Sequence, residues 1–137
     1  MSSPDSSTDH PASAAGLTGR RVLLVEDSPV VGPFTADLLA ELGCEVAGPA
    51  PNMASARQLL EQGGLDAALI DVHIRGERAF PLCELLEAKC VPLILTSGYA
   101  DWQQMADKWR DRPRLQKPYT LDQVREALKS VLANPTE

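Results

Sequence analysis

Short apolar runs alternate along the chain with segments that have the period of an amphipathic helix. Five of the runs predict β-strands, at positions 22–27, 44–50, 66–72, 91–98 and 114–118. Helices are predicted between them, and a last helix follows the fifth strand. Runs such as AALI and LIL are continuously apolar, which is typical of parallel strands that are covered on both faces. The pattern therefore predicts an α/β fold, a doubly wound five-stranded parallel sheet with helices on both faces.

The first predicted helix contains a proline near its start. Ser28 is its candidate N-cap, and Gly43 lies just past its end. Because Pro33 lacks an amide hydrogen, we expect the helix either to begin later or to be kinked in its first turn. The apolar stripe of this helix consists of Val31, Phe34, Leu38 and Leu42.

Two other helices have clear start signals. Asn52 is the candidate cap of the second helix, which ends at Gly63 and Gly64. Thr120 and Gln123 have the spacing of a capping box at the start of the last helix. The apolar residues that are predicted to face inward are Met53, Ala56, Leu59 and Leu60 in the second helix and Leu121, Val124, Leu128 and Leu132 in the last.

Residues 1–19 differ in composition from the rest of the chain. They are rich in Ser, Pro and Ala and have no apolar period. Such a segment buries too little surface to offset the entropy of ordering it, so we expect a disordered tail. The predicted domain covers 20–134, and 135–137 form a short tail. Since these few residues leave no room for an output domain, we expect the domain to stand alone.

Composition and charge limit the kinds of partner. The 137 residues carry a formal net charge of −6, which argues against binding to a nucleic-acid backbone. No signal peptide and no apolar stretch of about 20 residues is present, so no membrane span is predicted. Cys44, Cys83 and Cys90 lack metal-site spacing and are interpreted as small buried hydrophobic residues in a reducing compartment. A cytoplasmic protein is therefore expected.

Polar residues stand at the carboxyl ends of four predicted strands. Glu26 and Asp27 end the first strand, Asp71 the third, Ser97 the fourth and Lys117 the fifth. Functional groups gather at this edge of a doubly wound sheet, so we expect these side chains to converge. Three carboxylates raise each other's pKa unless a cation neutralises them, and Mg²⁺ with oxygen ligands is the simplest choice. With the donors Lys117 and Ser97 nearby, the composite suits a phosphoryl group.

Each of these groups also has a structural explanation. Glu26 and Asp27 could cap the following helix, and Ser97 could belong to a simple turn. Lys117 could pair with Asp71 without any phosphate. Asp71 is the hardest to explain in this way, because a carboxylate that ends a buried strand costs about 2–5 kcal/mol unless it is paired or metal-bound.

In this order along the chain, the residues resemble those of a two-component receiver domain, the phosphoacceptor module of bacterial response regulators. The residues that carry the resemblance are Glu26 and Asp27, Asp71, Ser97, and Lys117 and Pro118 before Tyr119. The stretch LTSGY at 95–99 resembles the Phe-Ala-Thr-Gly-Tyr signature of the FAT GUY receivers, which makes Ser97 rather than Thr96 the switch hydroxyl. The resemblance covers about 20–134 and implies a flavodoxin-like sheet with strand order 2-1-3-4-5.

The resemblance also implies a metal site. Asp27 and Asp71 would bind Mg²⁺ directly, and Glu26 would act through water. The main-chain carbonyl of His73 would complete the protein ligands, whereas the His73 side chain is expected to face solvent.

For the chemistry, the resemblance implies that Asp71 is phosphorylated and that Lys117 and Ser97 hold phosphoryl oxygens. One position departs from the family pattern, because Arg114 stands where ordinary receivers have an aromatic switch residue. We therefore expect phosphorylation to act by reordering the segment 97–114 instead.

The function expected from the sequence is that of a single-domain response regulator. It would accept a phosphoryl group on Asp71 from a sensor histidine kinase, for which the HWE type is a candidate, and would signal by protein–protein contact. It would catalyse only its own phosphorylation and dephosphorylation. Two alternatives stay open. One is a Mg²⁺-dependent phosphatase with an aspartyl-phosphate intermediate, for which the domain leaves little room for a substrate pocket and cap. The other is a non-phosphorylated adaptor.

Overall fold

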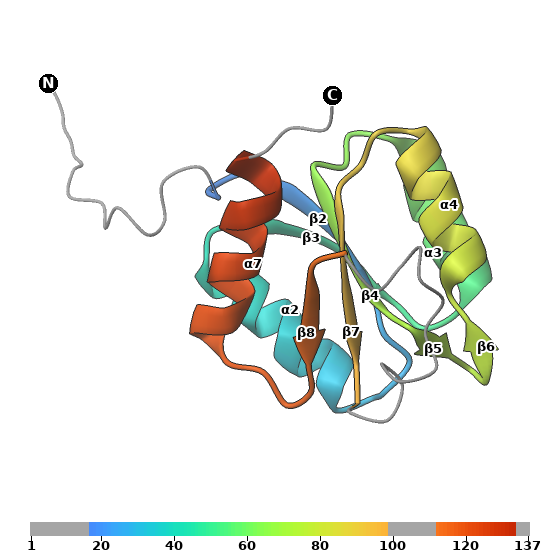
Figure 1. The fold of residues 1–137 in the computed structure, drawn as a ribbon, viewed down its shortest axis with the longest axis horizontal. Helices are drawn as coiled ribbons and strands as arrows, with labels where there is room; N and C mark the ends of the chain where they lie inside the picture. The colour runs from blue at the N-terminus through green and yellow to red at the C-terminus, as the bar shows by residue number, and fades with distance from the viewer. Residues whose placement is uncertain (1–16, 99–111, 134–137) are drawn as a thin grey trace, which may run out of the picture.

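The computed structural model describes residues 17–98 and 112–133 of the chain. Its main sheet has five parallel strands in the order β3-β2-β4-β7-β8 (Figure 1). The strands are β2 (Arg21–Val25), β3 (Glu45–Ala50), β4 (Ala67–Asp71), β7 (Leu93–Ser97) and β8 (Arg114–Gln116). Counted along the chain, this is the order 2-1-3-4-5, so the predicted doubly wound, flavodoxin-like α/β fold is confirmed.

Helices cover both faces of the sheet, as Figure 1 shows. On one face lie α2 (Val31–Glu41) and α7 (Leu121–Ala133), and on the other α3 (Met53–Gln62) and α4 (Phe80–Ala88). The helix that was predicted to end near residue 111 lies outside the described residues. Among the helices of the described part, none is long and apolar enough to cross a membrane.

The three inner strands β2, β4 and β7 are buried on both sides, which explains their long apolar runs. In β2, Leu23 and Val25 belong to the core under α3 and α4, whereas Val22 and Leu24 belong to the core under α2 and α7. All four side chains are at most 2% exposed. Alternate residues of one strand therefore supply two separate cores.

The predicted helix starts of α3 and α7 are confirmed by their hydrogen bonds. Asn52 Oδ1 accepts the Ser55 amide at 2.8 Å. Thr120 Oγ1 accepts the Gln123 amide at 3.2 Å, and Gln123 Oε1 accepts the Thr120 amide at 2.9 Å. This reciprocal pair is a complete capping box, which satisfies amides that have no partner within the helix.

The start of α2 follows the first of the two expected outcomes for Pro33. The helix begins at Val31, so Pro33 lies in the first turn, where its missing amide hydrogen removes no intrahelical bond. The N-cap is Val30 rather than the predicted Ser28, but Ser28 Oγ still accepts the amides of Val30 and Val31 at 3.2 and 3.0 Å. The predicted stripe is wrong at Phe34, which is 50% exposed, because the buried face of this turn is formed by Gly32 and Thr35 instead.

A small antiparallel hairpin after β4 was not predicted. It consists of β5 (His73–Ile74) and β6 (Glu77–Arg78), joined by the two-residue turn of Arg75 and Gly76. Both turn residues have positive φ, 54° and 80°, as a type I′ turn requires. Arginine adopts this conformation at a cost of about 1 kcal/mol, so the surroundings must favour it. Strands of two residues are too short for their alternation to be recognised in the sequence.

The N-terminal boundary of the domain also differs from the prediction. Leu17 is 1% exposed and belongs to the core under α2 and α7. The Gly19 amide donates to the Gly43 carbonyl at 2.8 Å, and Cys44 Sγ lies 3.6 Å from the Leu17 carbonyl. The folded domain therefore begins at or before Leu17 rather than at residue 20. Residues 1–16 lie outside the described part.

The three cysteines do not share one environment, although all were predicted to be buried. Cys44 and Cys83 are buried, whereas Cys90 is exposed just past the end of α4, with a φ of 60°. Burial raises the pKa of Cys83 to about 12, and it also raises the pKa of Cys44. Since the thiolate is the reactive form, these two thiols are protected in the native protein.

We expect a thiol reagent such as a maleimide to modify one cysteine, Cys90, in the native protein, and all three after unfolding in denaturant. Intact mass before and after unfolding would count the labels. The variant Cys90→Ser should take up no label in the native state. Rapid native labelling of this variant would show that the described burial of Cys44 or Cys83 is wrong.

Candidate functional site

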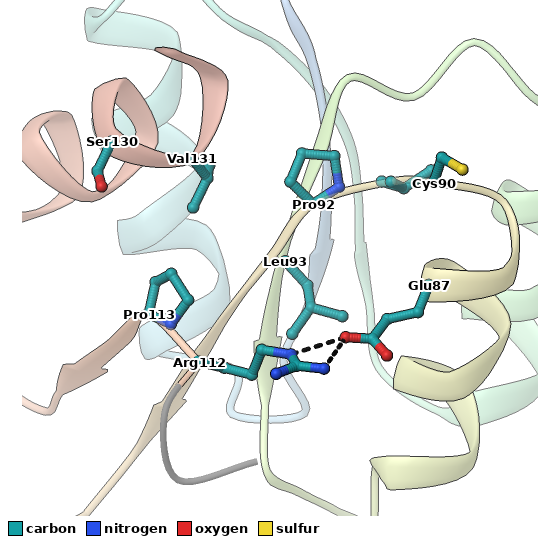
Figure 2. Close-up of a pocket in the computed structure, with 9 residues that line it drawn as sticks. Glu87, Cys90, Pro92, Leu93, Arg112, Pro113, Ser130 and Val131 are labelled. Atoms are coloured by element: carbon teal, nitrogen blue, oxygen red, sulfur yellow. Dashed lines mark hydrogen bonds and ion pairs between the residues drawn. The ribbon is translucent and has the colours of Figure 1, made fainter. Parts of the chain in front are cut away.

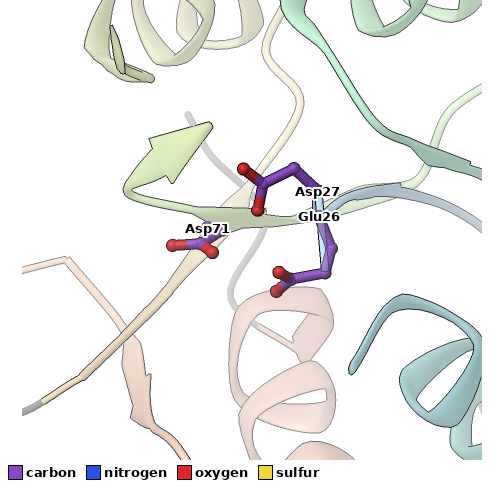
Figure 3. A group of neighbouring side chains, drawn as sticks. All are labelled: Glu26, Asp27 and Asp71. Atoms are coloured by element: carbon purple, nitrogen blue, oxygen red, sulfur yellow. The ribbon is translucent and has the colours of Figure 1, made fainter. Parts of the chain in front are cut away.

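Three carboxylates meet at the carboxyl edge of the sheet. Glu26 and Asp27 directly follow β2, and Asp71 is the last residue of β4, which pairs with β2 on one side and β7 on the other. One ligand oxygen from each residue lies within 4.8 Å of the other two. Figure 3 shows the three carboxylate groups pointing to the same side. The predicted convergence of these residues is therefore present in the fold.

Lys117 completes the cluster from the neighbouring end of β8. Its Nζ lies 2.7 Å from Asp71 Oδ2 and 2.9 Å from Glu26 Oε1. Burial alone would lower the pKa of Lys117, but the hydrogen bonds and charges of Asp71 and Glu26 outweigh it and raise that pKa above its ordinary value. Lys117 is therefore protonated at neutral pH, and its ammonium bridges the ends of β2 and β4.

Glu26 is the most deeply placed of the acids, at 3% exposure. Burial raises its pKa, and Asp71 adds to this effect; Lys117 and the Ser28 amide, which donates to Glu26 Oε2 at 3.1 Å, act in the opposite direction. The net shift is upward because desolvation is the largest contribution. A further positive charge at the cluster would favour the ionised form.

The donor set of the cluster fits Mg²⁺. Three carboxylates and one ammonium leave two negative charges, which one divalent cation neutralises. Hard divalent cations prefer oxygen ligands, and each of Glu26, Asp27 and Asp71 offers at least one.

Main-chain amides of the β5–β6 hairpin hold two of these carboxylates. The His73 amide donates to Asp71 Oδ1 at 3.1 Å, and the Arg75 amide donates to Asp27 Oδ2 at 2.8 Å. The sequence predicted the His73 carbonyl as a metal ligand, but it predicted neither this contact of the His73 amide nor any role for Arg75. The signal in the sequence was the pair Arg75 and Gly76, which is a weak indication of a two-residue turn.

Ser97 lies at the same sheet edge, one strand further along. The register pairs Asp71 with Thr96 and Ser97 with Gln116, so Ser97 is one residue past the direct neighbour of Asp71. Ser97 is fully buried, and its carbonyl accepts the Lys117 amide at 2.9 Å. Arg114, at the expected position of an aromatic switch residue, is exposed at the start of β8.

A buried hydroxyl pair connects the Lys117 segment to α2. The Tyr119 hydroxyl lies 2.6 Å from Thr35 Oγ1, and both residues are buried. Burial raises the pKa of Tyr119, so it stays neutral. Thr35 was not singled out in the sequence, where one threonine inside a helix carries no special signal. The pair fixes the chain that presents Lys117.

A cavity of about 510 Å³ lies away from this cluster, at the amino end of β7. It is bounded by α4, the start of β7, the segment before β8 and α7, and the ion pair of Glu87 and Arg112 forms part of its lining (Figure 2). Pro92 and Leu93 precede or begin β7, so this cavity is at the opposite edge of the sheet from Asp71. It contributes nothing to the acidic cluster.

Comparison with solved structures identifies the family. The chain is 35% identical to SdrG from Sphingomonas melonis Fr1, covering 84% of this chain and 97% of that chain with a TM-score of 0.73. It is 37% identical to the BeF3-activated conformation of SdrG from Pseudomonas melonis Fr1, covering 82% and 95% of the two chains with a TM-score of 0.72. The fold is also that of the receiver domain of the response regulator PhyR from Erythrobacter litoralis, with a TM-score of 0.78, 22% identity and coverage of 90% and 97%.

The chain therefore belongs to the receiver domains of response regulators. No family model matches the chain, and a search of curated proteins finds no match.

Proposed function

We propose that this receiver domain accepts a phosphoryl group on Asp71 and signals by protein–protein contact. The observation that carries the proposal is the position of Asp71, which ends the central strand β4 with Lys117 Nζ 2.7 Å from its carboxylate and two further acids beside it. Such a cluster combines a nucleophile, a fixed cation and a set of oxygen ligands. We assign Asp71, Ser97 and Lys117 to the phosphoryl group and Glu26, Asp27, Asp71 and the His73 carbonyl to Mg²⁺.

In the proposed reaction, a carboxylate oxygen of Asp71 attacks the phosphorus of a phosphohistidine donor. The new O–P bond forms as the P–N bond breaks, and the electron pair returns to the imidazole nitrogen. Lys117, which already contacts Asp71, balances the negative charge that builds up on the phosphoryl oxygens. When bound, Mg²⁺ supplies further neutralisation of that charge. Ser97 donates its hydroxyl hydrogen to a phosphoryl oxygen.

Membership of this family supports a sensor histidine kinase as the phosphoryl donor. The LTSGY stretch at 95–99 supports membership of the FAT GUY subclass. For this subclass we propose a kinase of the HWE type. Of this stretch, Tyr99 lies outside the described residues. Residues 99–111, which make up most of the segment 97–114 that we expect to reorder on phosphorylation, also lie outside the described residues.

The proposal is tested with the wild-type protein, Mg²⁺ and a small phosphodonor such as acetyl phosphate. We expect intact mass spectrometry to show the addition of one phosphoryl group, which a chelator prevents. An unmodified mass under these conditions would favour the adaptor alternative, in which Lys117 and Asp71 form a structural ion pair. Steady release of phosphate from small phosphomonoesters would favour the phosphatase alternative.

Mg²⁺ affinity should depend more on Asp27 than on Glu26. The resemblance to receiver domains makes Asp27 a direct ligand and Glu26 a ligand through water, and a direct ligand contributes more to affinity. We expect Asp27→Asn to weaken Mg²⁺ binding by about tenfold or more and the matched change Glu26→Gln to weaken it less. A titration followed by amide chemical shifts measures both constants. Equal Mg²⁺ affinity in wild type and Asp27→Asn would show that Asp27 is not a metal ligand.

A further inference from the structure

We propose that the main-chain amide of Arg75, presented by the β5–β6 hairpin, positions the Asp27 carboxylate for the divalent cation, and that the cation in turn stabilises the hairpin. This inference rests on the proposed function for the location of the cation. It goes further by making the hairpin a part of the site, with Arg75 as a positioning residue.

The contact joins two segments that are far apart in the chain. The Arg75 amide lies 2.8 Å from Asp27 Oδ2, across 48 residues of sequence. Within the hairpin, His73 pairs with Arg78 and Ile74 with Glu77, which leaves Arg75 and Gly76 as the turn. The first residue of a two-residue turn has no cross-strand acceptor for its amide. The Arg75 amide is thus available to a group outside the hairpin, and the Asp27 carboxylate is that group.

The conformation of the turn sets the direction of this amide. Arg75 has a φ of 54° and Gly76 a φ of 80°, both in the left-handed region. A side chain at position 75 makes this conformation unfavourable, so contacts of the turn with its surroundings have to hold it. The bond to Asp27 is one such contact. A second is the bond from Arg75 Nε to the Pro51 carbonyl, at 3.2 Å, in the segment that follows β3.

The hairpin is also anchored to the domain core, both beside its turn and at its base. Ile74 is fully buried in the core under α3 and α4. The Val72 amide donates to the Thr96 carbonyl at 3.0 Å, and the Ala79 amide donates to the Val72 carbonyl at 2.8 Å. A turn that is fixed at its base can hold Arg75 at a constant distance from Asp27.

The same hairpin also contacts Asp71, the other carboxylate that is proposed to bind the cation directly. The His73 amide donates to Asp71 Oδ1 at 3.1 Å, so Asp27 and Asp71 each receive one hairpin amide. With Oδ2 held by the Arg75 amide, the Asp27 carboxylate keeps a single orientation and presents Oδ1 in a fixed direction, whereas the second oxygen of Asp71 is bound by Lys117. By thermodynamic linkage, a cation that binds better when the hairpin is in place must stabilise the hairpin by the same factor.

The first experiment measures hydrogen exchange of single amides by NMR, without any metal or phosphodonor. Asp27→Ala removes the acceptor, so the Arg75 amide should exchange at least about tenfold faster than in the wild type. The Val72 amide, which donates to Thr96, is the internal control and should keep its rate. Unchanged exchange of the Arg75 amide would overturn the inference, because the contact would not exist in solution.

The second experiment measures Mg²⁺ affinity by chemical-shift titration. Arg75→Pro removes the amide hydrogen and fixes a negative φ, and we expect it to weaken binding by about tenfold. The control variant Arg75→Asn keeps the amide and tolerates the left-handed conformation, so its Mg²⁺ affinity should stay within about threefold of the wild-type value. Equal affinity of Arg75→Pro and wild type would overturn the inference. If Arg75→Pro does not fold, the hydrogen-exchange experiment with Asp27→Ala tests the inference in its place.

The wild type supplies the test of linkage. Adding Mg²⁺ should slow exchange of the Arg75 amide further, and a rate that stays unchanged at saturating Mg²⁺ would contradict the coupling. A wild-type protein that binds no Mg²⁺ would instead count against the metal site of the proposed function. The two failures are therefore distinguishable.

Discussion

Asp71→Asn is expected to abolish phosphoryl incorporation from a small phosphodonor. The carboxamide has no anionic oxygen to attack phosphorus, and no other carboxylate of the cluster combines a strand end with a direct contact to Lys117 and a hairpin amide. The fold should persist, because removing one of three crowded negative charges relieves repulsion while Lys117 keeps its contact with Glu26. The thermal unfolding midpoint of the variant should therefore be equal to or above that of the wild type.

Asp66→Asn is the matched control for this variant. Asp66 immediately precedes β4, at the opposite end of the strand from Asp71, and its Oδ2 accepts the Arg21 amide at 2.8 Å. This variant should be phosphorylated like the wild type. Incorporation into Asp71→Asn at the wild-type level would show that the phosphoryl group is on another residue.

Lys117→Met should have opposite effects on metal binding and on phosphorylation. Without the ammonium, the cluster loses a cation that competes with Mg²⁺ for Glu26 and Asp71, so Mg²⁺ should bind at least as tightly. The rate of phosphoryl transfer should fall by about 10²-fold, because one fixed charge that stabilises the transition state is gone. In the absence of Mg²⁺ the variant should be about 1–3 kcal/mol less stable, since two buried carboxylates lose the cation that they share and keep only one amide donor each. Mg²⁺ should restore much of this loss.

The control for the lysine variant is Lys89→Met, which removes the same charge from an exposed position at the end of α4. Metal affinity, rate and stability should all stay at wild-type values. If Lys117→Met were phosphorylated as fast as this control, Lys117 would be a structural residue and not part of the chemistry.

The framework of the fold could be predicted because it depends on strong, regular signals. The inner strands β2, β4 and β7 are buried on both faces, so each appears in the sequence as a run of mainly apolar residues. The helix starts at Asn52 and at Thr120 with Gln123 use side-chain caps, and those caps have fixed spacing. The acidic cluster followed from the same framework, since the carboxyl ends of parallel strands meet at one edge.

The features that were missed depend on contacts across the fold. Leu17 is an apolar residue in a polar segment, and only its packing against α2 and α7 shows that it belongs to the core. Cys90 is exposed because the chain turns into a left-handed conformation just after α4, which a cysteine does not signal. Arg75 acts through its main chain, and an amide is the same in every residue except proline, so its identity carried no information about Asp27.

The most direct measurement is to locate the phosphoryl group chemically. Reduction of the phosphorylated protein with borohydride converts an aspartyl phosphate into homoserine, and peptide sequencing by tandem mass spectrometry then identifies the position. We predict homoserine at position 71 alone, in protein treated with phosphodonor and Mg²⁺, and none in the chelator control. Homoserine at position 27 or at any other aspartate, or a phosphorylated protein in which position 71 remains aspartate, would contradict the assignment of Asp71 as the phosphoacceptor.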